Sequence, residues 1–363
     1  MEIITTDTKI NYENFKNTYS NIDFTSSLFF DIETTGFAAK NTKLYMIGAL
    51  YVSKETNTFY VTQWFLDNYD DEINILKSFY KFANNYTTLI HFNGNGFDIP
   101  YLEAKAATLD FALDFYAFTH IDLYKSSSKL KNFFKTENLK LKTIEQFLGL
   151  NRKDEFSGKE LIDVYKEYMK TKDEHLKAFL LLHNYEDLKG MLTVINVLSY
   201  NNMLNQGFSY KCSSIEPNSN ELILEFTLDI SIPKRISLSY DDIYMTAFDS
   251  KLKLKLSLYT EELKFFYDNY KDYYYLPAED MAIHKSVATY VDKEYKTKAK
   301  AANCYIRKDG LFLKQYKDIV HPYFKKNYND KISYFEWNND IENNSLILKQ
   351  YAAHLLNYLS QLK

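Results

Sequence analysis

The sequence predicts an α/β layer fold, in which helices flank a mixed sheet, followed by a smaller α+β domain. Three observations support this. Short, apolar, β-rich runs occupy the first third of the 363-residue chain, helical periodicity continues to residue 200, and alternating β runs return beyond residue 206. Strands followed by covering helices make a layered α/β fold. We therefore expect two domains, over residues 1–205 and 206–363, with a boundary near Gln206, where Asn, Gly, Ser and Pro are frequent.

Five strands and five helices are expected in the first domain. The strands are Leu28–Ile32, Leu44–Val52, Phe59–Phe65, Thr88–Phe92 and Thr119–Asp122. A turn at residues 54–57 joins the second strand to the third, so the first three strands are expected to form a meander. The helices are Asp71–Phe82, Ile99–Ala107, Leu141–Leu148, Leu161–Met169 and Glu174–Leu198.

The second domain is expected to combine strands with helices. Its first strands are Leu222–Ile230, Ile236–Phe248 and Leu252–Tyr259, with a hairpin turn near Ser250. A further hairpin is expected over Ala301–Tyr316, around Asp309-Gly310. Helices are expected over Ala278–Tyr290, which has two acids in its first turn, and over Asn344–Leu362.

The composition narrows the class of protein. The net charge of −4 gives no global basic character, so any nucleic-acid surface would be local. Two cysteines are too few for a disulfide framework or a cysteine metal site, which fits a reducing cytoplasm. No apolar run reaches membrane-spanning length, and residues 1–11 lack the apolar core of a signal peptide. We expect a cytoplasmic protein without a membrane partner.

The segment from Phe29 to Phe37 carries the strongest chemical signal. Asp31 and Glu33 lie two residues apart at the end of a short apolar strand, so their side chains point to the same face. Two adjacent anions are costly in an apolar setting unless a cation neutralises them. One interpretation is a hard divalent metal with oxygen ligands. The other is a strand that ends in solvent with two hydrated acids.

Two later segments carry further acids. Asp98 follows the fourth expected strand and two glycines, at the start of a helix, where an N-cap is the simpler interpretation. His183 and Asp187 are four residues apart on the last long helix and therefore share a face. A solvated pair on a surface helix would have the same spacing.

Taken in order, these motifs resemble a known family. Asp31-Ile32-Glu33-Thr34-Thr35-Gly36, Asn93…Phe97-Asp98 and His183-x-x-x-Asp187 resemble the three motifs of the DEDD (DnaQ-like) 3′–5′ exonucleases of the ribonuclease H-like superfamily. The stretches at residues 121–124, 141–145 and 158–161 are similar to the bacterial branch of RNase H-like predicted exonucleases. The resemblance covers roughly residues 24–200 and implies a ribonuclease H-like mixed sheet flanked by helices.

The resemblance also implies an activity, a metal-dependent 3′–5′ exonuclease that hydrolyses terminal phosphodiesters of single-stranded DNA or RNA to nucleoside 5′-monophosphates. The metal ligands would be Asp31, Glu33, Asp98 and Asp187, holding two Mg²⁺ or Mn²⁺ ions. His183 would be the general base, because an imidazole titrates near neutral pH. Asn93 and the backbone groups around Thr34 and Thr35 would bind the 3′-terminal nucleotide.

The third motif departs from both branches of that family. The tyrosine branch has Tyr-x-x-x-Asp and the histidine branch has His-x-x-x-x-Asp, whereas this chain has histidine at the tyrosine spacing. On a helix, the i+4 spacing keeps His183 beside Asp187, and i+5 would move it well off that face. Three roles for His183 are therefore considered: a base, a weak base, or a group that acts only on its neighbours.

A basic run in the second domain is a candidate substrate surface. Nine cations and three anions lie between residues 285 and 317, with aromatic side chains among them. Lysines on phosphates and aromatic rings on bases hold single strands, and we name Lys296, Lys298 and Lys300 as candidates. A solvated face in a chain rich in Lys and Tyr would show the same pattern.

Two alternative functions belong to other classes. One is a non-catalytic nucleic-acid-binding module that keeps the fold, and the other is an RNase H-like endonuclease. The presence of all four carboxylates favours an enzyme over the first of these. The sequence does not separate DNA from RNA, because that difference is recognised at the 2′-hydroxyl, and it identifies no protein partner.

Overall fold

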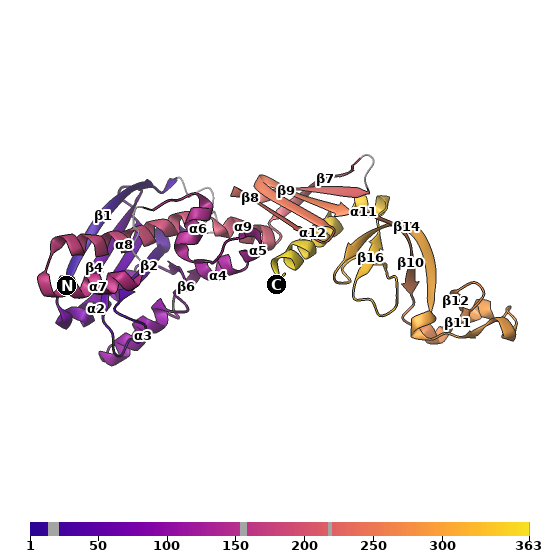
Figure 1. Ribbon diagram of the computed structural model, residues 1–363, viewed down its shortest axis with the longest axis horizontal. Helices are drawn as coiled ribbons and strands as arrows, with labels where there is room; N and C mark the ends of the chain where they lie inside the picture. Colours follow the sequence, from indigo (N-terminus) through magenta and orange to yellow (C-terminus); the bar gives the residue numbers. More distant parts are fainter. Residues whose placement is uncertain (14–21, 153–157, 217–219, 363) are drawn as a thin grey trace. The chain divides into compact units, whose positions relative to one another are not determined.

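The structure is a computed structural model that describes residues 1–13, 22–152, 158–216 and 220–362. The chain divides into two compact units, Met1–Asn201 and Asn202–Lys363 (Figure 1). The first unit is an α/β layer with helices on a mixed sheet, and the second contains three further sheets with a C-terminal helix. The fold class expected from the sequence is confirmed.

The first unit contains a six-stranded sheet of order β1-β4-β3-β2-β5-β6. Its strands are β1 Glu2–Asn11, β2 Ser27–Thr34, β3 Leu44–Val52, β4 Thr58–Phe65, β5 Thr88–His91 and β6 Thr119–Asp122. The expected meander β2-β3-β4 is present and antiparallel, while β5 and β6 add to β2 in parallel. The sheet is therefore mixed, with β2 close to its centre.

The helices of the first unit also follow the sequence pattern. They are α2 Glu72–Ala83, α3 Asp98–Thr108, α4 Leu123–Ser128, α5 Lys131–Phe134, α6 Leu141–Leu148, α7 Gly158–Thr171 and α8 Glu174–Val194. The expected helix over 174–198 ends at Val194, and α9 Val197–Leu204 follows it. Gly149 ends α6 in the left-handed conformation, which glycine adopts at little cost.

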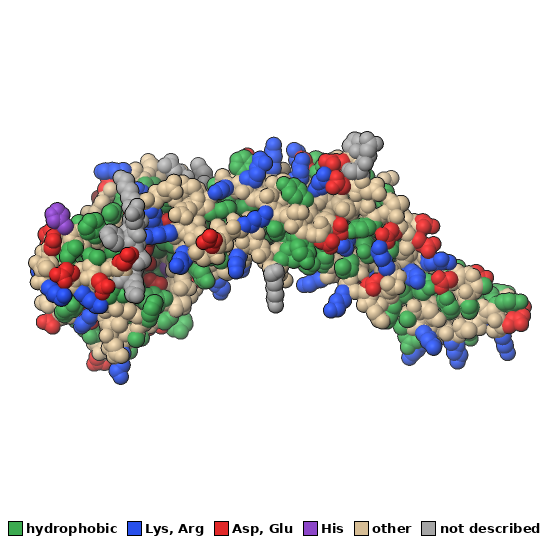
Figure 2. Space-filling model, in the orientation of Figure 1, with side chains coloured by type: hydrophobic (Ala, Val, Ile, Leu, Met, Phe, Trp, Pro, Cys, Tyr) green, Lys and Arg blue, Asp and Glu red, His purple; other side chains and the backbone are tan. Residues whose placement is uncertain are grey.

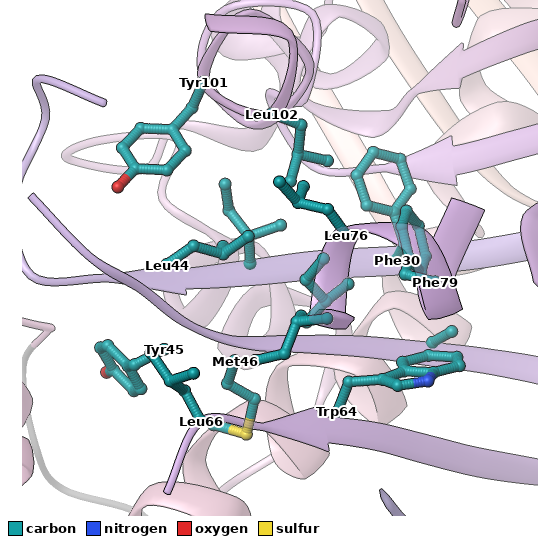
Figure 3. Packing of buried hydrophobic residues seen from close by; sticks show 14 of the residues in the cluster. Phe30, Leu44, Tyr45, Met46, Trp64, Leu66, Leu76, Phe79, Tyr101 and Leu102 are labelled. Atoms are coloured by element: carbon teal, nitrogen blue, oxygen red, sulfur yellow. The ribbon is translucent and has the colours of Figure 1, made fainter. Parts of the chain in front are cut away.

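Helices α2 and α8 cover opposite faces of the sheet. Successive side chains on a strand point to opposite faces. On β2, Phe30 contacts Phe79 of α2, with 5.7 Å between ring centroids, whereas its neighbour Asp31 accepts a hydrogen bond from Asn184 of α8. The α2 face is an apolar core that also contains Trp64, Leu76 and Leu102 (Figure 3). Polar side chains of β2 therefore gather on the α8 face.

Strand β1 was not expected. It pairs antiparallel with β4 at the edge of the sheet, from Glu2↔Phe65 to Asn11↔Thr58. Its side chains are mostly polar because an edge strand exposes much of its surface to water. The polar sequence therefore gave no strand signal.

The second unit contains sheets of order β7-β8-β9, β10-β14-β16-β15 and β12-β11-β13. The strands are β7 Phe208–Ile215, β8 Glu221–Tyr240, β9 Ile243–Ser257, β10 Tyr259–Phe266, β11 Tyr273–Leu276, β12 Met281–His284, β13 Thr297–Lys298, β14 Tyr305–Gln315, β15 Tyr323–Phe324 and β16 Ser333–Glu336. Helix α12 Ser345–Ser360, which was expected, packs against β7. The other helices are α10 Lys285–Ala288 and α11 Asn339–Glu342.

Three expectations for the second unit are wrong. The hairpin turn lies at Asp241-Asp242, where Asp241 adopts φ +50°, instead of near Ser250. Strand β9 runs through Ser250 without a turn and pairs with β8 on both sides of it, with register shifts between. Strand β14 crosses Asp309-Gly310 without turning, since Gly310 pairs with Glu261 of β10.

The expected helix over Ala278–Tyr290 is also wrong. Residues 281–284 form β12, which pairs with β11 after a turn in which Asp280 has φ +51°. The helical periodicity there was too short to outweigh cross-strand pairing, and α10 is all that remains of it. None of the described helices is long and apolar enough to cross a membrane.

Candidate metal centre

Asp31 and Glu33 lie side by side on the α8 face of β2, as their spacing predicts. They are not hydrated acids at a strand end, because the side chain of Glu33 is only 12% exposed and β2 lies between β3 and β5. Burial, followed by the charges of Asp187, Asp98 and Glu33, raises the pKa of Asp31 well above its usual value. Burial also raises the pKa of Glu33 to about 7. Both carboxylates lie where a cation would be stabilised.

Asp98 belongs to the same site and does not cap its helix. It is the first residue of α3, is buried, and its Oδ1 accepts a hydrogen bond from the backbone N–H of Ile32 at 3.2 Å. The second motif is thereby attached directly to the first. Burial raises the pKa of Asp98 to about 7, although the bond from Ile32 opposes that shift. The N-cap interpretation is therefore wrong.

The loop before Asp98 is held by the buried His91 and the half-buried His120. The Gly94 N–H donates to His91 Nδ1 at 3.0 Å, so His91 Nε2 carries the proton that faces His120 Nδ1 at 3.3 Å. Burial lowers the pKa of His91 to about 4, which keeps the ring neutral. A Cβ at position 94 would lie 2.5 Å from the His91 ring, so glycine is required there. This packing fixes the turn that places Asp98.

Helix α8 brings His183 and Asp187 to the same face of the sheet. His183 Nε2 lies 3.5 Å from Asp187 Oδ2 and 3.7 Å from Glu33 Oε1. One ligand atom from each of these three residues lies within 4.8 Å of the other two, a spacing that could hold a metal ion. The i+4 spacing therefore directs both side chains into the site, and neither is a solvated surface group.

Asn184 connects α8 to the first carboxylate. Its Nδ2 donates to Asp31 Oδ2 at 3.1 Å, and its Oδ1 accepts from Gln63 Nε2 at 3.0 Å. A Cβ on Gly48, which faces Asp31 across the β2–β3 pair, would lie 1.9 Å from Asn184 Oδ1. Glycine at position 48 thus permits the close approach that orients Asp31.

A buried ion-pair network holds the other end of the site. Arg152 donates to Asp187 and, through two nitrogens, to Glu145 of α6, and its side chain is only 6% exposed. Burial raises the pKa of Glu145, an effect that Arg152 opposes. A Cβ on Gly190 of α8 would lie 1.7 Å from Glu145 Oε1. Glycine at this helical position therefore makes room for the Glu145–Arg152 pair.

A cavity of about 500 Å³ opens beside the carboxylates. Asp31 and Asp187 line it together with Phe92, Asn93 and Tyr124 and with residues 138–141. The Phe92 and Tyr124 rings meet edge to face, with centroids 5.7 Å apart. The volume lies within the range of roughly 300–1,000 Å³ that ligand sites occupy. Acidic and aromatic side chains thus meet in one accessible cavity.

The predicted substrate-binding residues fall into two groups. Asn93 lines the cavity with φ +63°, and its N–H donates to Asp122. The Thr34 and Thr35 hydroxyls are occupied locally, bonding to Gly36 O at 2.9 Å and to Lys43 N at 2.8 Å.

The predicted lysines belong to the second unit. Lys298 and Lys300 are exposed, whereas the ammonium of Lys296 is bonded to the carbonyl oxygens of Ala288 and Val291. Because of those bonds, Lys296 is poorly placed to receive a phosphate.

Comparison with known proteins finds a superfamily match within the first unit. Residues 28–199 match the RNase_H superfamily model. No curated protein matches the chain. Among solved structures, the family B DNA polymerase from the hyperthermophilic archaeon Pyrobaculum calidifontis is similar over 50% of this chain, at 17% identity and a TM-score of 0.38. The chain spans about a quarter of that polymerase (25%).

The donor set of the first unit fits a divalent metal. Asp31, Glu33, Asp98 and Asp187 are hard oxygen donors. Among the described residues, Arg152 forms an ion pair with Asp187. Burial and mutual repulsion raise the pKa values of Asp31, Glu33 and Asp98. A doubly charged ion would offset this repulsion and stabilise the ionised carboxylates. The first unit therefore carries a suitable ligand set for Mg²⁺ or Mn²⁺.

Several residues of this site were missed in the sequence. Arg152 is one of three arginines in a chain that otherwise uses lysine. Gly190 is one of nine glycines and lies within a long helix. Both are unusual enough to have served as signals. Gln63 and Tyr45, whose hydroxyl donates to Glu33 Oε2 at 3.3 Å, lie in apolar strands and carried no such signal.

Proposed function

We propose that the RNase H-like domain is a metal-dependent 3′–5′ exonuclease that releases nucleoside 5′-monophosphates from single-stranded DNA or RNA. The observation that carries the proposal is the convergence of Asp31, Glu33 and Asp98 with Asp187 beside an open cavity. The match of residues 28–199 to the RNase_H superfamily supports a nuclease.

The carboxylates Asp31, Glu33, Asp98 and Asp187 are the proposed ligands of two Mg²⁺ or Mn²⁺ ions. When bound, such ions lower the pKa of water and stabilise the attacking and leaving oxygens of an in-line displacement. The backbone N–H of Ile32 keeps the Asp98 carboxylate oriented, and Asn184 does the same for Asp31. These bonds hold the ligands in place before substrate arrives, which limits the reorganisation that binding requires.

His183 is the proposed general base. Its Nε2 faces the carboxylates of Glu33 and Asp187, which would stabilise the imidazolium that forms when the ring accepts a proton. The same position also suits a metal ligand, and the two roles differ in how a substitution changes metal affinity.

The cavity beside Asp31 is the proposed site of the 3′-terminal nucleotide. The rings of Phe92 and Tyr124 could stack on a base, since each lines this cavity. Backbone groups near Thr34 and Thr35 would also contact the nucleotide, because the hydroxyls of both residues already form hydrogen bonds within the protein.

The test is hydrolysis of matched single-stranded DNA, single-stranded RNA and duplex oligonucleotides, each labelled at the 5′ end, with Mg²⁺ and Mn²⁺ compared. The proposal predicts a ladder that shortens progressively from the 3′ end, absent with chelator and absent in Asp31→Asn. A closed single-stranded circle should survive. Cleavage of that circle would instead indicate an endonuclease, and binding without any hydrolysis would indicate a non-catalytic module.

A further inference from the structure

Two cavities in the second unit meet at Tyr270. One, of about 520 Å³, is lined by Tyr270, Lys271, Tyr273, Tyr274, Lys285, Lys298 and Ala299. The other, of about 300 Å³, is lined by Phe266, Tyr267, Asp268, Tyr270, Ala301, Tyr323, Lys325 and Tyr328. We call them together the tyrosine–lysine groove. Both volumes fall within the range of about 300–1,000 Å³ that small ligands occupy.

The rings of the groove are held by the small sheet β12-β11-β13. Tyr274 of β11 lies between Ile283 of β12 and Lys298 of β13 in the ladder, so these side chains share a face. Tyr273 stacks on Tyr267, with centroids 4.4 Å apart and planes at 18°. Rings fixed in this way lose little conformational entropy when a flat ligand stacks on them.

The lysines of the groove are available for an anion. Among the described residues, Lys271 and Lys298 have no carboxylate within ion-pair distance, whereas Lys285 pairs with Asp272 at 3.0 Å. Other cations of the basic run are neutralised: Lys308 pairs with Glu336, and Lys314 pairs with Asp241. Figure 2 shows blue and green side chains, with some red ones, over the end of the second unit where Figure 1 places β11 and β12.

We propose that the tyrosine–lysine groove binds single-stranded nucleic acid, with bases on the tyrosine rings and phosphates at Lys271 and Lys298. Aromatic platforms edged by lysine provide both interactions without reading sequence. The choice of nucleic acid over another polyanion rests on the nuclease function proposed above. The groove is a second binding site, formed by residues of the second unit alone.

The test is fluorescence anisotropy with a labelled 20-nucleotide oligo-dT and the full chain in excess chelator, so that no hydrolysis occurs. Tyr270→Ala should weaken binding about tenfold through the lost stacking. Lys271→Ala/Lys298→Ala should flatten the slope of log affinity against log salt by about 1.4, since each phosphate contact on a single strand contributes about 0.7.

The matched control is Tyr244→Ala/Lys251→Ala on β9, where both side chains are exposed in the same unit. This variant should bind like the wild type. A second probe is an abasic strand of equal length, which should bind wild type more weakly than oligo-dT and should not distinguish wild type from Tyr270→Ala. Circular dichroism confirms that each variant is folded.

Two results would overturn this inference: groove variants that bind like the control, or an abasic strand or polyglutamate that binds wild type as tightly as oligo-dT does. These outcomes are separate from failure of the proposed nuclease, because binding is measured without metal and without turnover. If the chain degrades oligonucleotides while the groove variants bind normally, only the proposal that the groove binds nucleic acid is contradicted. A chain that binds through the groove but never hydrolyses would contradict the nuclease alone.

Discussion

The Asp98 carboxylate accepts a hydrogen bond of 3.2 Å from the backbone N–H of Ile32, the residue between Asp31 and Glu33. Strand β5 pairs with β2 only from Ser27 to Phe29, and beyond that point Asp98 supplies the partner that a neighbouring strand would give Ile32. This bond fixes the Asp98 carboxylate of α3 relative to Asp31 and Glu33 of β2. Repulsion among them is offset in the proposed enzyme by divalent metal.

Asp98→Asn should remove the negative charge of this side chain while keeping its size and its hydrogen bond with Ile32. The amide oxygen can still accept from Ile32, but one buried anion is lost, so the metal-free variant should be at least as stable as wild type at pH 8. Nuclease activity should fall at least about 10²-fold, because loss of a metal ligand removes several kcal/mol of transition-state stabilisation. Thermal unfolding with and without Mn²⁺, beside an end-labelled nuclease assay, measures both effects. Full activity in this variant would exclude Asp98 as a ligand.

Stability of the metal-free protein should fall as pH rises through neutrality. The folded pKa of Glu33 is raised from 4.5 to about 7, that of Asp98 from 3.8 to about 7, and that of Asp31 also lies above its usual value. The folded state therefore binds more protons than the unfolded state between about pH 4 and 7, so the free energy of unfolding is greatest at the acidic end and decreases toward pH 8.

Divalent metal should reverse this dependence, because the ion binds the deprotonated carboxylates and displaces protons. Chemical denaturation at pH 5, 6, 7 and 8, with chelator and with Mn²⁺, gives both curves. Calorimetry at pH 6.5 in two buffers of different ionisation enthalpy should detect proton release on Mn²⁺ binding. Equal heats in the two buffers, or a metal-free stability that rises from pH 6 to 8, would contradict the raised pKa values.

Arg152→Met should destabilise the domain because it leaves the buried Glu145 carboxylate without its cationic partner. Glu145 is fully buried, and removing one member of a buried ion pair costs about 3–5 kcal/mol. Adding Glu145→Gln should restore part of the loss, since the remaining group is then neutral. Urea unfolding of both variants and of Glu145→Gln alone forms the double-mutant cycle. Equal stability of Arg152→Met and wild type would show that the pair contributes nothing to the fold.

Gly190→Ala should destabilise the protein although alanine is the better helix former by about 1 kcal/mol. The new Cβ would lie 1.7 Å from Glu145 Oε1, so the Glu145–Arg152 pair or α8 must move. Because Arg152 also donates to Asp187, activity should fall together with the melting temperature. The control is Lys189→Ala at the neighbouring exposed position of α8. A Gly190→Ala variant that is more stable than wild type would contradict the close approach.

His183→Gln separates the two roles proposed for the imidazole. If His183 is the base, kcat should fall, the acidic limb of the pH–rate profile should disappear, and Mn²⁺ affinity should stay within about threefold. If it ligates metal, Mn²⁺ affinity should fall by about 10-fold to 100-fold. Kinetics across pH 5.5–9, with parallel Mn²⁺ titration, distinguish these outcomes. Unchanged kinetics and affinity would remove His183 from the site altogether.

The sequence predicted the first unit well because its local and global signals agree. The apolar meander and the helical periodicity of α2, α3 and α6 were strong enough to place these elements within a few residues. Spacing alone also placed Asp31 and Glu33 on one strand face and His183 and Asp187 on one helix face. What spacing could not show is the contact between Asp98 and Ile32, which depends on where β5 ends.

The sequence predicted less where pairing at long range decides the structure. In the second unit, the chain turns at Asp241 and Asp280, which both adopt a positive φ. The sequence pattern instead predicted turns near Ser250 and at Asp309-Gly310. The sequence also could not show which cations of the basic run are paired with a carboxylate. Carboxylates distant in sequence neutralise Lys308 and Lys314, whereas Lys298 has no such partner among the described residues. Charge counted along the chain is therefore a poor guide to charge at a surface.

The most direct test of the central claim is Mn²⁺ binding by electron paramagnetic resonance, in which the six-line signal of free Mn²⁺ reports what remains unbound. After treatment with chelator and its removal, the wild-type chain should bind two Mn²⁺ ions, and Asp31→Asn/Asp98→Asn should lose both sites while keeping its circular dichroism spectrum. A wild-type chain that leaves Mn²⁺ free, or a variant that binds it equally well, would contradict the proposed metal centre.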